Sequence, residues 1–167
     1  MRRGMAATMA AACCAVPASA HAQTATSGTP QSLFTHQLLT DRGTAADIRA
    51  ALRAKRVFVD EDITFADLTG DGRQDAVVRV DSGGAPGTVA VYVFSTDGAS
   101  KLRAIYRNQR LYRALASVNG ATVLLDTPRY QPGDEICCAA QMLERSLTWS
   151  AKAKRLVLRS TRVTSIT

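Results

Sequence analysis

The 167-residue sequence is poor in aromatic residues and in histidine. Aromatic side chains make up 5% of the chain, and of its two histidines only His36 lies beyond the first 22 residues. No Gly-x-Ser-x-Gly pattern occurs, so nothing indicates a hydrolase in which histidine activates a serine. Because no catalytic pattern of this kind occurs, we expect a protein that is not an enzyme. As a separate point, no apolar run reaches the roughly 20 residues of a membrane-spanning helix.

The first 22 residues have the pattern of a cleavable signal peptide. Arg2 and Arg3 precede an uncharged, mostly apolar run over residues 5–16, and small residues flank a cleavage position after Ala22. This predicts a secreted or cell-envelope protein. A minor alternative is a lipoprotein anchored at Cys13, because residues 9–13 weakly match the motif at which bacterial lipoproteins are processed.

Cleavage after residue 22 would leave a basic protein with 19 basic and 14 acidic residues, a net charge of +5. We expect no nucleic acid as partner, because exported proteins seldom meet it. An anionic envelope polymer or another envelope protein is the better candidate. Four arginines are candidates for a cationic strip on adjacent strands, and the alternative is that they only keep the exposed sheet face soluble: Arg103, Arg107, Arg110 and Arg113.

Residues 23–32 are polar and aperiodic, which predicts a flexible linker before a single domain over residues 33–167. Two helical patterns open the domain, one around residues 33–39 and one over residues 44–56. In the second, Thr44 is placed to cap the helix, and Ile48, Ala51 and Leu52 share one face.

After residue 57, β-branched and aromatic runs alternate with turn residues, which is typical of strands. Short connections, such as the Asn119-Gly120 pair, predict antiparallel hairpins. We expect an α+β fold, an antiparallel meander of about six to eight strands with one or two N-terminal helices packed on it. Two nearly continuous apolar runs, residues 76–80 and 88–94, are expected to be central strands. The eight expected strands cover residues 57–66, 75–80, 88–95, 101–107, 111–118, 121–126, 142–150 and 155–161.

The string Asp-Leu-Thr-Gly-Asp-Gly-Arg-Gln-Asp, residues 67–75, places oxygen-bearing side chains at alternate positions around a glycine turn. Calcium takes six to eight oxygen ligands, and such a turn can supply several of them. The string resembles the Asp-rich loop of FG-GAP and VCBS-type repeats. That resemblance implies calcium bound by the side chains of Asp67, Thr69, Asp71 and Asp75 and by the carbonyl of Arg73. The alternative is a metal-free turn in which the carboxylates accept backbone amides.

Beyond residue 22 the only cysteines are the adjacent Cys137 and Cys138. Exported cysteines are usually paired. Three arrangements remain open: a vicinal disulfide, which we favour, a bond to another chain, or two buried thiols. A redox or metal-binding role is a weaker hypothesis, because the pair lacks the spacing of Cys-x-x-Cys.

Together, the N-terminal pattern, the Asp-rich turn, the strands and the Gly-Asp-x-x-Cys-Cys loop resemble a class of small exported actinobacterial proteins that includes the LppP/LprE-type lipoproteins. The resemblance covers about residues 57–160 and implies a secreted or envelope protein. We expect a non-catalytic binding or structural module of unknown ligand. The alternative is a secreted hydrolase with a carboxylate-based site, for which Asp134, Glu135 and Glu144 are candidates.

Overall fold

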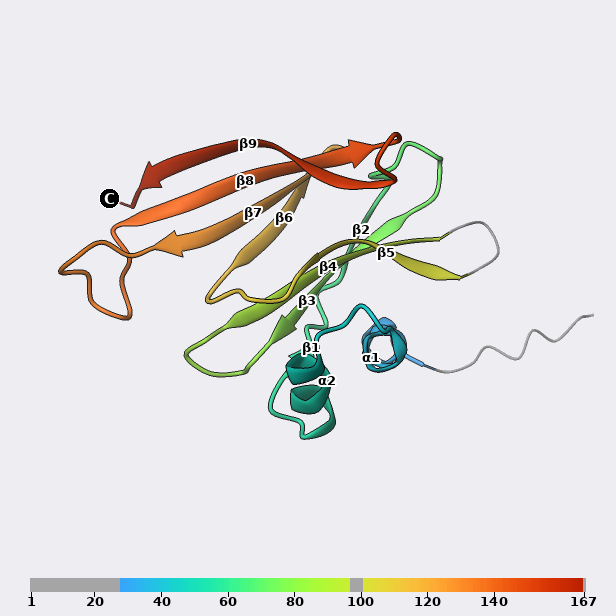
Figure 1. The fold of residues 1–167 in the computed structure, drawn as a ribbon, viewed down its shortest axis with the longest axis horizontal. Coiled ribbons are helices and arrows are strands. Elements are labelled where there is room, and N and C mark those ends of the chain that lie inside the picture. The colour runs from blue at the N-terminus through green and yellow to red at the C-terminus, as the bar shows by residue number, and fades with distance from the viewer. Residues whose placement is uncertain (1–27, 97–100, 167) are drawn as a thin grey trace, which may run out of the picture.

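The computed structural model describes residues 28–96 and 101–166, and it consists of two helices and two antiparallel sheets (Figure 1). The expected signal peptide lies outside the described residues. The α+β meander predicted from the sequence is confirmed, although its strands divide between two sheets. The helices are α1 (Pro30–Thr40) and α2 (Ala46–Arg53). Within the described ranges, no helix combines the length and hydropathy that a membrane span requires.

The first sheet has the strand order β1-β3-β4-β5, with β2 also paired to β3. Its strands are β1 (Phe58–Val59), β2 (Thr64–Ala66), β3 (Asp75–Asp81), β4 (Thr88–Thr96) and β5 (Leu102–Asn108). The second sheet runs in sequence order through β6 (Leu115–Asn119), β7 (Thr122–Arg129), β8 (Gln141–Ser150) and β9 (Arg155–Ser165). Every pairing in both sheets is antiparallel.

The central position predicted for the two apolar runs is confirmed by β3 and β4, which are buried on both faces. Val78 and Tyr92 belong to a core shared with Phe34 and Leu38 of α1 and with Ile48 and Leu52 of α2. Val77, Val91 and Val93 belong to a second core, which contains Val123 and Leu125 of the second sheet. The first sheet therefore lies between the helices and the second sheet, and this explains why its two central strands lack polar alternation.

The single strand expected over residues 57–66 is wrong, because the structure splits it into β1 and β2. Between them, the Asp60 carboxylate accepts the amide of Asp62 at 2.9 Å, and the Glu61 carbonyl accepts the amide of Ile63 at 2.9 Å. This side-chain turn bends the chain, a behaviour typical of aspartate. Both short strands still pair with β3, one at each of its ends.

The helix boundaries differ from the expected ones for local reasons. Thr29 caps α1 by accepting the amide of Ser32 at 3.2 Å, so residues 30–32 are helical rather than part of the linker. The cap predicted at Thr44 is wrong. The helix α2 starts at Ala46, so its N-cap residue is Ala45, and no side chain of this residue caps the helix. Instead, Gln109 Oε1 accepts the amide of Ala45 at 2.5 Å.

Gln109 connects the loop before α2 to strand β4 of the first sheet. Its Oε1 also accepts the buried Tyr92 hydroxyl at 2.8 Å, and its Nε2 donates to the Gly43 carbonyl at 3.1 Å. Burial raises the pKa of Tyr92, so the hydroxyl stays a protonated donor. A residue from the β5–β6 connection thus fixes the loop before α2 against the middle of β4.

We expect Gln109→Ala to lower the free energy of unfolding by about 1–3 kcal/mol, because the Tyr92 hydroxyl and the Ala45 amide lose their acceptor. Urea unfolding followed by far-ultraviolet circular dichroism measures the change. Exposed Gln74 provides the control, since Gln74→Ala should change stability by less than about 0.5 kcal/mol. Equal effects of the two substitutions would contradict the role assigned to Gln109.

Candidate functional site

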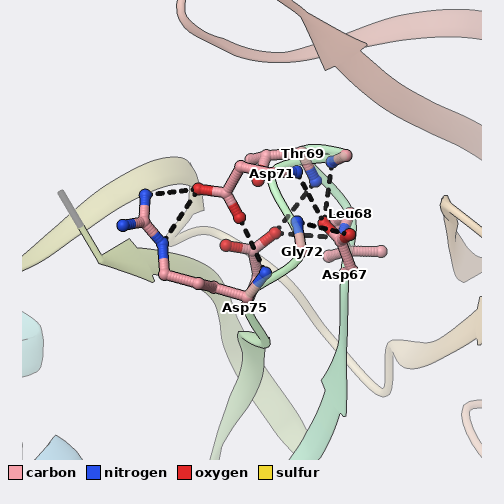
Figure 2. Close-up of polar contacts among 8 residues, drawn as sticks. Asp67, Leu68, Thr69, Asp71, Gly72 and Asp75 are labelled. Carbon is pink, nitrogen blue, oxygen red and sulfur yellow. Dashed lines mark hydrogen bonds and ion pairs between the residues drawn. The ribbon is translucent and has the colours of Figure 1, made fainter. Parts of the chain in front are cut away.

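The Asp-rich turn connects β2 to β3, and its carboxylates are occupied by the backbone of the turn itself (Figure 2). Asp67 accepts the amides of Gly70 at 2.7 Å, Asp71 at 3.2 Å and Gly72 at 2.9 Å. Gly70 and Gly72 have φ of 75° and 79°, a conformation that glycine adopts without strain. The side chain of Asp67 therefore organises the whole turn.

Asp75 closes the turn from the other side. It is the first residue of β3 and is 1% exposed, and its Oδ2 accepts the amides of Leu68 at 2.9 Å and Thr69 at 3.0 Å. A buried carboxylate needs such donors to offset the loss of water. Leu68 is itself part of the core between the sheets, so these bonds tie the turn to the packed interior.

Asp71 points outward and pairs with Arg73. Its Oδ2 lies 2.5 Å from Arg73 Nη2, and its Oδ1 accepts the Arg73 amide at 3.0 Å. The hydrogen bond from the Arg73 side chain, followed by the one from its amide, lowers the pKa of Asp71. The residue therefore stays ionised at neutral pH, but its carboxylate already has a cationic partner.

This arrangement meets the needs of calcium only in part. Among the described residues, the acidic side chains of Asp67, Asp71 and Asp75 do not bring an oxygen each within 4.8 Å of one another. Thr69 Oγ1 is shielded from solvent and lies near Asp71 without a well-formed hydrogen bond, so it is a side-chain oxygen of the turn that an ion could satisfy. Calcium binding would require Asp71 to leave Arg73 and turn inward, so it stays a prediction.

A second candidate region is the Cys loop, which we define as residues 130–140 between β7 and β8. Figure 1 shows it at the opposite end of the molecule from the Asp-rich turn. Asp134 Oδ2 accepts the amides of Gln131 at 2.7 Å and Ala140 at 2.9 Å, and these two bonds lower the pKa of Asp134. The loop is therefore closed at its base by a carboxylate that stays ionised.

The cysteines of this loop are exposed, and their sulfur atoms are in close contact. The contact is the one that a vicinal disulfide needs, whereas the exposure is inconsistent with two buried thiols. Arg113 Nη1 donates to the carbonyls of Ile136 at 3.3 Å and Cys137 at 3.0 Å, and the Tyr130 hydroxyl donates to Ile136 at 2.8 Å. The backbone beside the cysteines is thus held from two directions.

A cleft of about 820 Å³ lies between the Cys loop and the β3–β4 hairpin. Its polar lining includes Asp81, Arg113 and Tyr130, and its apolar lining includes Leu115, Met142 and Ile166. Cys137 and Cys138 form part of its wall. The sequence did not reveal this cleft, because most of its lining residues come from segments far apart in the chain, and only Cys137 and Cys138 belong to a motif recognised there.

Asp81 is the cleft residue with the most unusual electrostatics. Burial raises the pKa of its carboxyl, and the nearby Asp60 adds to this effect; Asp81 Oδ1 is shielded from solvent without a hydrogen-bond partner. For Asp60, burial acts in the same direction, but hydrogen bonds outweigh it and lower the pKa. One of these bonds comes from Arg79, whose Nη2 lies 2.6 Å from Asp60 Oδ2. The pKa values of the two carboxyls are therefore shifted in opposite directions, upward for Asp81 and downward for Asp60.

The four arginines considered as a cationic strip lie in different environments. Arg107 pairs with Asp41 beside α1 at 2.8 Å, and Arg103 donates to the Lys154 carbonyl of the β8–β9 turn at 3.0 Å. A β-bulge in β5 leaves Ile105 unpaired and reverses the facing of the residues around it. Because Arg113 is bound to the Cys loop, these side chains do not form one continuous strip.

The calcium prediction is tested by thermal unfolding in millimolar calcium and in a chelator. Calcium binding predicts a higher melting temperature with calcium, a larger rise in Arg73→Ala, which releases Asp71, and no rise in Asp71→Ala. Asp62→Ala serves as the control, because this carboxylate is 88% exposed and outside the turn. A melting temperature that calcium leaves unchanged in both the wild type and Arg73→Ala would show that hydrogen bonds alone close the turn.

We expect Asp81→Asn to stabilise the protein at neutral pH. The folded-state pKa of Asp81 lies above its unfolded value, so stability is lost as pH rises from the unfolded pKa through the folded pKa. Asparagine removes that loss, and the difference from wild type should vanish at pH values below the unfolded pKa. Urea unfolding between pH 3 and pH 8, at about one-unit steps, measures it. A difference that is constant over this range would contradict the raised pKa.

The chain matches no protein-family model, no curated protein and no solved structure.

Proposed function

We propose that the chain is a non-catalytic binding module that works outside the cytoplasm, secreted or in the cell envelope, and that it holds an anionic envelope polymer at the Cys-loop cleft. The single observation that carries this proposal is the cleft itself. Its walls come from the β3–β4 hairpin, the start of β6, the Cys loop and the end of β9. Clefts with an apolar lining and a few polar groups are the usual form of a binding site.

The cleft is held in shape by bonds between these segments. The Arg113 amide donates to the Pro86 carbonyl at 2.7 Å, and the Ile166 amide donates to the Ala140 carbonyl at 2.9 Å. The hairpin lies so close to Arg113 that a Cβ added to Gly87 would be 3.4 Å from the Arg113 Cα. A preformed cleft loses little conformational freedom when a ligand binds, which supports binding as its role.

Charge favours an anionic ligand. The expected processed chain has a net charge of +5, and Arg113 brings a guanidinium group to the cleft. Guanidinium groups bind phosphate and carboxylate oxygens through paired hydrogen bonds. Only Nη1 of Arg113 is among the atoms bonded to the Cys loop, so the group has further donors for a ligand.

A secreted hydrolase remains a second candidate, and Asp81 is the observation that favours it. A carboxyl with a raised pKa in a cleft, beside a second carboxyl with a lowered one, is the arrangement that acid catalysis uses. The carboxylates considered from the sequence are placed differently. Asp134 binds loop amides, and Glu144 pairs with Arg162 at 3.0 Å.

Binding at the cleft is tested with a matched pair of hairpin variants. Ala85 is exposed and lines the cleft, whereas Ala121 is exposed in the β6–β7 turn. We expect immobilised anionic wall polymer to retain the wild type and Ala121→Trp at low salt but to release both at high salt. The immobilised polymer should not retain Ala85→Trp at low salt, because the indole ring of this variant fills the cleft.

Retention of Ala85→Trp equal to that of the wild type would overturn the cleft as the binding site, and no retention of the wild type at low salt would overturn the ligand class. The same polymer incubated with the protein in solution addresses the hydrolase. Release of fragments that is lost in Asp81→Asn would identify an enzyme.

A further inference from the structure

We propose that Glu135, Cys137 and Cys138 form a three-ligand site for a thiophilic divalent cation, such as Zn²⁺ or Cd²⁺, when both cysteines are reduced. This goes beyond the proposed function and does not depend on it, because polymer binding at the cleft requires no metal. It assigns a chemical role to a cluster at the rim of the cleft.

The three side chains already converge. One ligand atom from each, the two sulfur atoms and a carboxylate oxygen, lie within 4.8 Å of one another. Cys137 Sγ is 3.5 Å from Glu135 Oε2. The backbone brings them together, because the Cys138 amide donates to the Glu135 carbonyl at 2.9 Å and the two residues form an isolated β-bridge.

The loop is fixed by contacts that leave the ligand atoms free for an ion. Asp134 binds two amides at the base of the loop, and Arg113 and Tyr130 bind backbone carbonyls of Ile136 and Cys137. All three proposed ligand residues are exposed, so an ion can reach them from solvent. A loop ordered in advance loses less entropy when the ion binds.

Two thiolates and one carboxylate are a ligand set that Zn²⁺ accepts, with metal–sulfur bonds of about 2.3 Å and metal–oxygen bonds of about 2.0–2.2 Å. Tetrahedral coordination then has a fourth position for water or for a group in the adjoining cleft. The sulfur atoms must separate from their present contact, which rotation of the two cysteine side chains allows.

The site exists only in the dithiol state. A dithiol reductant transfers two electrons and two protons to the cystine, whose sulfur–sulfur bond breaks, and is itself oxidised to a disulfide. The cation then displaces the two thiol protons and binds both thiolates. Since the disulfide offers no thiolate, disulfide formation and cation binding exclude one another, and each stabilises its own redox state of the loop.

The experiment uses the full chain with Cys13→Ser and Cys14→Ser, so that Cys137 and Cys138 are the only thiols. The protein is reduced with a phosphine, its thiols are counted, and Cd²⁺ is added while the ultraviolet thiolate-to-cadmium absorption is recorded. We expect saturation at one ion per chain, no absorption in the oxidised protein, and none after Cys137→Ser together with Cys138→Ser.

Glu135→Gln tests the third ligand and should weaken Cd²⁺ binding by at least the roughly tenfold that the loss of an outer-shell partner of a metal ligand costs. Glu61→Gln is the matched control, since Glu61 is an exposed carboxylate outside the Cys loop, and it should bind as the wild type does. Circular dichroism checks that each variant stays folded. Two free thiols without the absorption would overturn the site, and binding by Glu135→Gln equal to that of Glu61→Gln would remove Glu135 from it.

Discussion

The rest of the structure depends on the burial of β3 and β4 on both faces. One face of these strands packs on α1 and α2, and the other packs on the second sheet. Burying apolar surface is the dominant favourable term in folding, and here a single pair of strands supplies it to both cores. The helices and the second sheet do not share a core, so the first sheet is what holds them in one molecule. The Asp-rich turn belongs to this sheet, the Cys loop belongs to the sheet packed on it, and the cleft lies between segments of both.

This constraint explains why much of the fold could be predicted from the sequence. The runs over residues 76–80 and 88–94 have few polar residues, which is typical of a strand covered on both sides. Antiparallel pairing followed from short connections, and the β6–β7 turn has the expected glycine, with Gly120 at φ 57°. The division into two sheets was not predictable, because alternation along a strand shows which faces are buried but not which sheet covers them.

The candidate sites show a similar limit. The residues of the Asp-rich turn are consecutive, so the sequence identified them and also the alternative in which they bind backbone amides. Glu135 lies two residues before Cys137, and this spacing was a signal for the cluster that the sequence analysis did not use. Asp81 carried no such signal, and Arg113 was a candidate only as a member of the cationic strip. They are separated by more than thirty residues and meet at the cleft only because the β3–β4 hairpin returns toward the start of β6.

The bulge in β5 has a consequence for where the positive charges of this strand lie. Because the extra residue reverses the alternation, Arg103 and Arg107 stand on opposite sides of one strand, one toward the β8–β9 turn and the other toward α1. Two positive charges that would have reinforced each other on one face instead act in opposite directions. These two arginines therefore do not form a single cationic patch along β5. In the proposed function, the orientation of a polyanion therefore depends on short-range contacts at the Cys-loop cleft, to which Arg113 brings a guanidinium group.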